Sequence, residues 1–86
     1  MPYQILIERS VVKYLKRIPE TDYYLIKTKI QSLANDPRPN GSIKLKGRNA
    51  YRIRQGDYRI IYEIRDKALV IIIVTVGHRK EIYRIK

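Results

Sequence analysis

The sequence predicts an α+β fold: an N-terminal strand, two helices, and then an antiparallel meander of three or four strands. Apolar residues recur every three or four positions between residues 11 and 34, which is typical of amphipathic helices. From residue 43 onward they recur at every second position, as in half-buried strands. Residues 68–76 are apolar on both faces, which indicates a central strand covered on both sides. We therefore expect both helices to pack on one face of a twisted sheet.

The elements are expected to form a single domain, residues 1–86. Two independent cores in a chain of 86 residues would each fall near the size at which folding alone becomes marginal. Phe and Trp are absent, although 44% of the residues are hydrophobic. The core is therefore expected to consist of Ile, Leu and Val, with tyrosine as the only aromatic residue in it.

The N-terminal half supplies the first strand and both helices. The segment "YQILIE", residues 3–8, alternates as a strand does. Residues 11–18 follow a helical pattern that Pro19 ends. A second helix is expected to have Thr21 as its N-cap and to run to about Ala34. The stretch "NDPRPNGS" that follows predicts a connector rich in turns.

The C-terminal half predicts three strands, at residues 50–55, 58–65 and 68–76, separated by "QGD" and "RDK" turns. If the apolar sets of the first two strands pack against the helices, Arg52, Arg54 and Arg59 must share the other face of the sheet. Like charges on neighbouring strands destabilise a sheet by a few tenths of a kcal/mol per pair, and Glu63 is the only acid interleaved among them. A solvated face is one interpretation. Bidentate binding of phosphate groups is the interpretation that we favour.

Charge points to the same kind of ligand. The formal net charge is +11, of which residues 1–42 carry +3 and residues 43–86 carry +8. Such an excess makes a polyanion the default partner, although a generally basic surface would show the same numbers.

The composition argues against several other classes of protein. The chain has no Cys and one His, so neither a metal site nor any other cofactor is expected. Its longest apolar run, residues 68–74, is far shorter than the roughly 20 residues that span a bilayer. The N-terminus lacks the pattern of a signal peptide, so we expect a cytoplasmic protein without a membrane partner.

The C-terminal segment "GHRKEIYRIK" adds groups that suit the chemistry of RNA cleavage. A bend at Gly77 would bring His78, Arg79 and Tyr83 to the end of the sheet, beside the arginines. Cleavage without a metal requires removal of the 2′-hydroxyl proton, stabilisation of charge on the phosphorane, and protonation of the departing 5′-oxygen. Arginine suits only the second task because its pKa is above about 12. His78 and Tyr83 are the candidates for proton transfer, with Glu63 a third if it reaches the same edge.

The ordered set "KLKG…YRIRQGDYRIIYEI…LVIIIVTVGHRKEIYR", with the strand and helix pair before it, resembles the RelE/ParE superfamily of toxins over essentially the whole chain. The resemblance implies a RelE-like fold and a cognate antitoxin that keeps the toxin inactive. Members of the RelE branch cut mRNA in the ribosomal A site and leave a 2′,3′-cyclic phosphate. Members of the ParE branch poison DNA gyrase and are not nucleases.

The resemblance also implies roles for individual residues. The catalytic set that it implies is Arg52, Arg54, Arg59, Arg79 and Tyr83, with His78 added as a further candidate. Contacts to RNA are expected from Lys44, Lys46 and Arg48 as well as from Arg52 and Arg54, although the two lysines could equally cap a loop. Some RelE enzymes have lysines where this chain has Arg52 and Arg54, and one of those lysines is the proposed general base. Arginine cannot take that role.

The first hypothesis is therefore a metal-independent, ribosome-dependent mRNA endonuclease, with the ribosome, mRNA and a cognate antitoxin as partners. Two alternatives remain open: a ParE-like gyrase inhibitor, and a non-toxic basic module that binds RNA.

Overall fold

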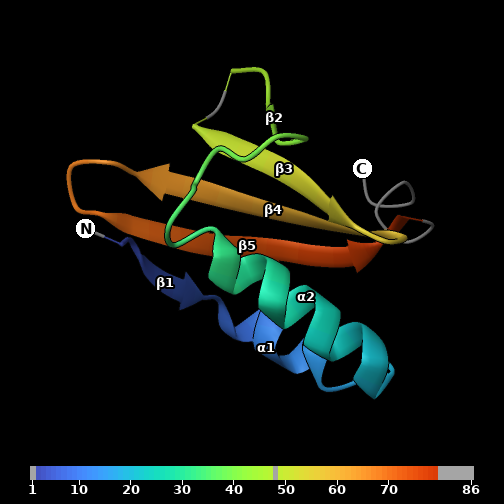
Figure 1. The fold of residues 1–86 in the computed structure, drawn as a ribbon. Helices are drawn as coiled ribbons and strands as arrows, with labels where there is room; N and C mark the ends of the chain where they lie inside the picture. The colour runs from blue at the N-terminus through green and yellow to red at the C-terminus, as the bar shows by residue number, and fades with distance from the viewer. Residues whose placement is uncertain (1, 48, 80–86) are drawn as a thin grey trace.

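The structure, a computed structural model, describes residues 2–47 and 49–79, which form two helices and a five-stranded mixed sheet (Figure 1). In chain order the elements are β1 (Gln4–Ile7), α1 (Arg9–Leu15), α2 (Glu20–Ser32), β2 (Ile43–Lys44), β3 (Ala50–Gln55), β4 (Tyr58–Arg65) and β5 (Val70–His78). The predicted α+β fold is confirmed. The meander corresponds to β3, β4 and β5, and the short β2 extends it at one edge.

The strands lie in the order β1-β5-β4-β3-β2, and β1 pairs with β5 in parallel. Because β5 is flanked by β1 and β4, it is an interior strand, which accounts for its long apolar run. It begins at Val70, later than predicted, since the preceding turn extends to Leu69, whose φ of 55° lies in the left-handed region. The predicted bend at Gly77 is wrong, because β4 continues to pair with β5 as far as His78.

The helices differ from the prediction at their ends. Thr21 is not the N-cap of α2, because the helix already begins at Glu20. Pro19 occupies the cap position, and its carbonyl accepts the Tyr23 N–H at 2.9 Å. Helix α2 ends at Ser32, and α1 begins two residues earlier than predicted and ends at Leu15. Neither helix has the length and apolar character needed to cross a lipid bilayer.

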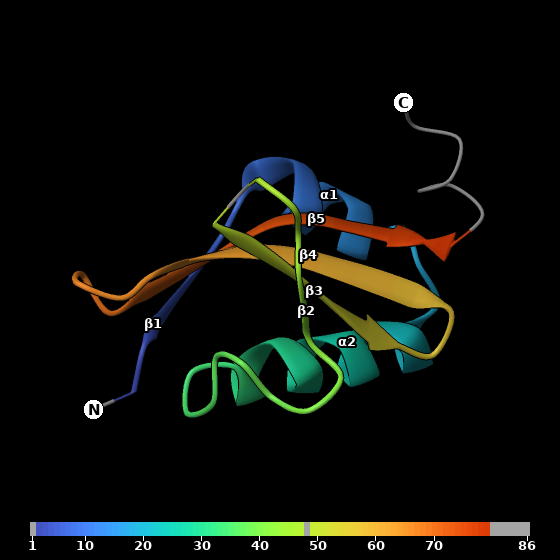
Figure 2. The same ribbon diagram turned by 90° about the horizontal axis from the view of Figure 1, so that it is seen from above.

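One hydrophobic core joins both helices to the sheet. Figure 2, seen from above, shows α1 beside β5 and α2 beside β3. Its fully buried side chains include Ile26 and Ile30 of α2 and Ile60, Tyr62 and Ile73 of the sheet. Burial raises the pKa of Tyr62 to about 12, and its hydroxyl donates a hydrogen bond to the Pro37 carbonyl at 2.7 Å. The connector after α2 is thereby attached to the core.

A polar network on the surface holds the same connector to the far end of the sheet. Arg38 forms a bidentate ion pair with Asp66, with Nη2–Oδ2 at 2.8 Å and Nη1–Oδ1 at 3.3 Å. Tyr3 donates to Asp66 Oδ1 at 2.7 Å, and Arg38 Nε donates to the Tyr51 hydroxyl at 3.0 Å. The hydrogen bonds from Arg38 and Tyr3 hold the pKa of Asp66 below its usual value.

Replacing Asp66 by Asn should therefore make stability less dependent on pH. The stabilisation from the Asp66 carboxylate is fully present above its ordinary pKa of about 3.9 and is lost as the pH falls through the lower pKa of the folded state. At pH 7 the Asp66→Asn variant should unfold at a lower urea concentration than the wild type, and this gap should narrow in acid. Asp36→Asn, an exposed carboxylate of the same connector, is the control. A gap of constant size from pH 7 down to about pH 2, below the ordinary range of the Asp pKa, would contradict this account.

Candidate functional site

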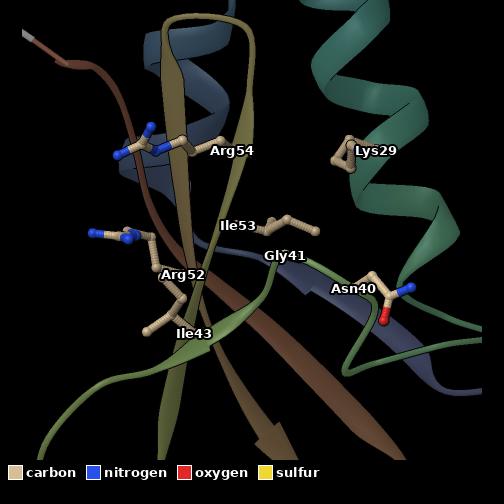
Figure 3. A pocket seen from close by; sticks show the side chains of 7 residues that line it. All are labelled: Lys29, Asn40, Gly41, Ile43, Arg52, Ile53 and Arg54. Carbon is tan, nitrogen blue, oxygen red and sulfur yellow. The ribbon is translucent and has the colours of Figure 1, made fainter.

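Three arginines lie on the face of the sheet that points away from the helices. Arg54 of β3 is the cross-strand partner of Arg59 of β4, and Arg52 is the partner of Ile61. Their neighbour Ile53 points to the core and is 4% exposed. Figure 3 shows Arg52 and Arg54 on one side of β3 and Ile53 on the other. The expected alternation therefore brings the three arginines onto one surface, which we call the arginine face.

The three arginines of the arginine face differ in their exposure to solvent. On an open solvated surface all three would be exposed. Arg59 is 7% exposed, whereas Arg52 is half-buried and Arg54 is exposed. The partner of Arg59 on β5 is the buried Gly77, which has no side chain and so leaves room beside the arginine. A guanidinium held away from bulk water interacts more strongly with an approaching anion than an exposed one does.

Arg79 joins this group at the end of the sheet. Its backbone N–H donates to the Asp57 carbonyl at 2.8 Å, which attaches it to the turn between β3 and β4. Arg79 directly follows β5 and is exposed, at the end of the sheet where Arg54 and Arg59 pair. Figures 1 and 2 show the end of β5 beside the turn between β3 and β4.

His78 lies on the opposite side of the sheet from the arginines. It pairs with Tyr58, and the two rings meet edge to face with centroids 5.4 Å apart. Its backbone N–H donates to the Tyr14 hydroxyl at 3.0 Å. The structure therefore brings His78 to the correct end of the sheet but not to the arginine face.

Glu63 lies on the arginine face but far from its charged end. It is four residues from Arg59 along β4, or about 13 Å at the usual rise of a strand. Arg65 Nη2 donates to Glu63 Oε1 at 2.7 Å. Glu63 thus does not reach the edge at which proton transfer was considered.

The remaining predicted residues contribute less to this surface. Lys44 pairs with Tyr51, which places it on the helix-facing side of the sheet, while its neighbour Ile43 lies with Arg52. Lys46 is exposed in the loop before β3. Arg48 and Tyr83 lie outside the described residues.

Within residues 2–47 and 49–79, no group of three or more His, Asp or Glu side chains is arranged to hold a metal ion. What the described site offers is positive charge on a rigid sheet, with several bidentate donors for phosphate oxygens. Such a surface can orient a phosphodiester and stabilise added negative charge on it.

Two further residues near this site were not predicted: Lys29 of α2 and Asn40 of the connector. They line a cavity together with Arg52 and Arg54. In the sequence, Lys29 falls at a polar position of the predicted helix, as solvated lysines commonly do. Its position beside β3 depends on how the helix packs on the sheet, which local periodicity does not specify.

The chain is similar to known toxins in sequence and in structure. Residues 5–83 match the sequence model of a family described as the ParE toxin of type II toxin-antitoxin system, parDE. The RelE1 protein of Methanocaldococcus jannaschii is 30% identical over 88 residues, which cover 98% of each chain.

Solved structures agree with the sequence match. RelE in the archaeal RelE-RelB complex from Pyrococcus horikoshii OT3 is 35% identical, with a TM-score of 0.83 over 92% of this chain and 97% of that one. The RelB-RelE antitoxin-toxin complex from Methanococcus jannaschii gives 37% identity and a TM-score of 0.75 over 92% and 95% of the two chains.

The direct pairing of Arg54 with Arg59 predicts a cost in stability. Arg54→Gln should raise the free energy of unfolding by a few tenths of a kcal/mol at low salt, because it removes one of two like charges that face each other across strands. The gain should shrink in about 1 M salt, where the Debye length is about 3 Å. Urea unfolding at both salt concentrations measures this, with Lys67→Gln, an exposed cation of the turn after β4, as the control. A loss of stability at low salt would show that the repulsion is not significant.

Proposed function

This chain belongs to the ParE toxin family of type II toxin-antitoxin systems and has the RelE fold, and we propose that it is a ribosome-dependent mRNA endonuclease. The observation that supports this activity is the arginine face, with Arg59 held away from water and Arg54 exposed above it. Guanidinium groups concentrated at one end of a rigid sheet can stabilise the charge of a phosphorane, a task that a toxin acting by steric binding alone does not have.

The proposed reaction is an internal transfer of the phosphodiester. The 2′-oxygen of the ribose attacks the phosphorus and loses its proton, while the bond from phosphorus to the 5′-oxygen breaks. The 5′-oxygen gains a proton, so the products are a 2′,3′-cyclic phosphate and a 5′-hydroxyl. The barrier arises from the charge that builds on the phosphoryl oxygens, which fixed cations can offset.

The arginines are assigned the electrostatic part of this reaction. Arg52 and Arg54 would hold the scissile and adjacent phosphates through paired N–H donors. Arg59 and Arg79 would stabilise the charge that develops in the transition state. None of them is a base at neutral pH, because the arginine pKa is above about 12.

Proton transfer is assigned to Tyr83, on the strength of the family resemblance. His78 is left out of this step, because its ring packs against Tyr58 on the helix-facing side. Glu63 is left out as well, because its carboxylate is engaged by Arg65 far along the strand. The arginine face supplies positive charge but few groups that can donate or accept a proton. The ribosome would supply the groups that this surface lacks.

We also propose that a cognate antitoxin covers this surface. The formal charge of +11 and the arginine face would otherwise attract RNA without selection. An acidic segment of a partner would neutralise it. The RelE proteins of P. horikoshii and M. jannaschii were each solved with a RelB partner.

A partner of this kind should be encoded beside the toxin. Co-expression with the product of the adjacent reading frame should yield a complex that survives purification and relieves growth arrest. Expression of the toxin alone should arrest growth. Normal growth on induction of the toxin alone would contradict toxicity and favour a non-toxic RNA-binding module.

A second candidate function follows from the description of the family model, which names ParE. A ParE-like protein would inhibit DNA gyrase with the same scaffold and would cut no RNA. Primer extension on translated mRNA separates the two: discrete cuts in phase with codons support the endonuclease, and intact mRNA with broken DNA supports gyrase poisoning.

Replacing Arg79 by Ala tests the proposed mechanism directly. The cleavage rate should fall about a hundredfold to a thousandfold, the loss typical of removing one donor that stabilises transition-state charge. Because the Arg79 side chain is exposed, the urea midpoint should stay the same. Arg65→Ala, which removes an arginine from the far end of the same strand pair, should cleave at the wild-type rate. A loss of less than tenfold for Arg79→Ala would remove Arg79 from the mechanism.

A further inference from the structure

A cavity of about 440 Å³ lies at the free edge of β3, beside the arginine face. Figure 3 shows Arg52 and Arg54 on one side of the strand and Lys29 and Asn40 on the other, with the side chain of Ile53 directed toward them. The volume is within the range of about 300–1,000 Å³ that is usual for small-ligand sites.

The cavity is open to the arginine face because β2 is short. In the described part of the chain, β2 pairs with β3 only through Ile43–Arg52 and Lys44–Tyr51. Among the residues that the structure describes, no strand is hydrogen-bonded to this edge of β3 beyond Arg52. A chain bound on the arginine face can therefore pass around the edge of β3 into the cavity.

The lining suits a nucleotide better than a simple anion. Ile43 is 49% exposed and offers an apolar surface for the flat face of a base. The side-chain amide of Asn40 carries a donor and an acceptor side by side, the pairing that adenine presents with its N6 and N7 atoms. Lys29 supplies a positive charge on the opposite wall for a phosphate.

We propose that this cavity binds the nucleotide next to the scissile linkage and that Asn40 favours adenine there. This inference rests on the proposed endonuclease function. The base lies against Ile43, the Asn40 amide contacts its edge, and Lys29 contacts the adjoining phosphate. Recognition of single-stranded RNA in this way, by a base edge and a packed base face, is common among RNA-binding proteins.

An acidic peptide is the competing occupant. Lys29, Arg52 and Arg54 would attract carboxylates as well as phosphates. The apolar surface favours the nucleotide, since a carboxylate gains nothing from it, and only a base edge pairs with the donor and the acceptor of the amide together. The experiment below therefore measures RNA and antitoxin binding with the same variants.

The test uses the full chain and short oligoribonucleotides with a 2′-deoxy sugar at the expected scissile linkage, which bind but cannot be cut. Lys29→Ala should weaken binding and reduce the slope of log Kd against log salt by about 0.7, the value for one phosphate contact on a single strand. Asn40→Ala should reduce the preference for adenine over the other bases beside that linkage by about fivefold or more. Asn35→Ala and Lys67→Ala, both exposed and outside the cavity, should match the wild type.

The outcomes separate this inference from the proposed function. If the oligonucleotides bind as described but translated mRNA is never cut, the endonuclease proposal fails and the nucleotide site stands. The site is overturned if Lys29→Ala and Asn40→Ala bind as the wild type does, if no oligonucleotide binds, or if the two variants lose affinity for the antitoxin alone. Unchanged urea midpoints show that both variants fold.

Discussion

The pairing register of β3, β4 and β5 is the constraint on which the rest of the structure depends. Because side chains alternate, the register that places Ile53 beside Ile60 in the core also places Arg54 beside Arg59 outside it. A slip of one residue would bury guanidinium groups and expose the core. The irregular pairing after Ile61 shifts β5 by one residue, which is how a β-bulge redirects the strand that follows. The site is therefore as fixed as the core itself.

The features that followed from local periodicity could be predicted from the sequence. The buried face of α2 was predicted from the spacing of Ile26, Ile30 and Leu33, and all three are buried. The common face of Arg52 and Arg54 followed from alternation within one strand. Placing Arg59 on the same face required one further assumption, that the apolar side chains of both strands pack in a single core. The structure agrees with this assumption.

Features that depend on contacts distant in sequence could not be predicted. The parallel pairing of β1 with β5 has no local signal, because a strand pattern does not specify its neighbour. The burial of Arg59 depends on the absence of a side chain at Gly77, 18 residues away on β5. The N-cap of α2 was predicted at Thr21 from its residue type, but Pro19 already allows the helix to begin. Lys29 meets β3 only because α2 packs across the sheet.

The distribution of acids links the proposed site to its proposed control. Glu63 shares the arginine face but contacts Arg65, and Asp66 is held by Arg38 and Tyr3 at the far end of the sheet. Glu63 is engaged by Arg65 and lies four residues from Arg59 along β4, so neither carboxylate offsets the charge of Arg54 and Arg59. Negative charge from another molecule is therefore favoured where Arg54 and Arg59 pair, whether it comes from a phosphodiester or from an acidic partner. The same uncompensated charge would thus make the toxin bind RNA and let an antitoxin exclude RNA by occupying the surface first.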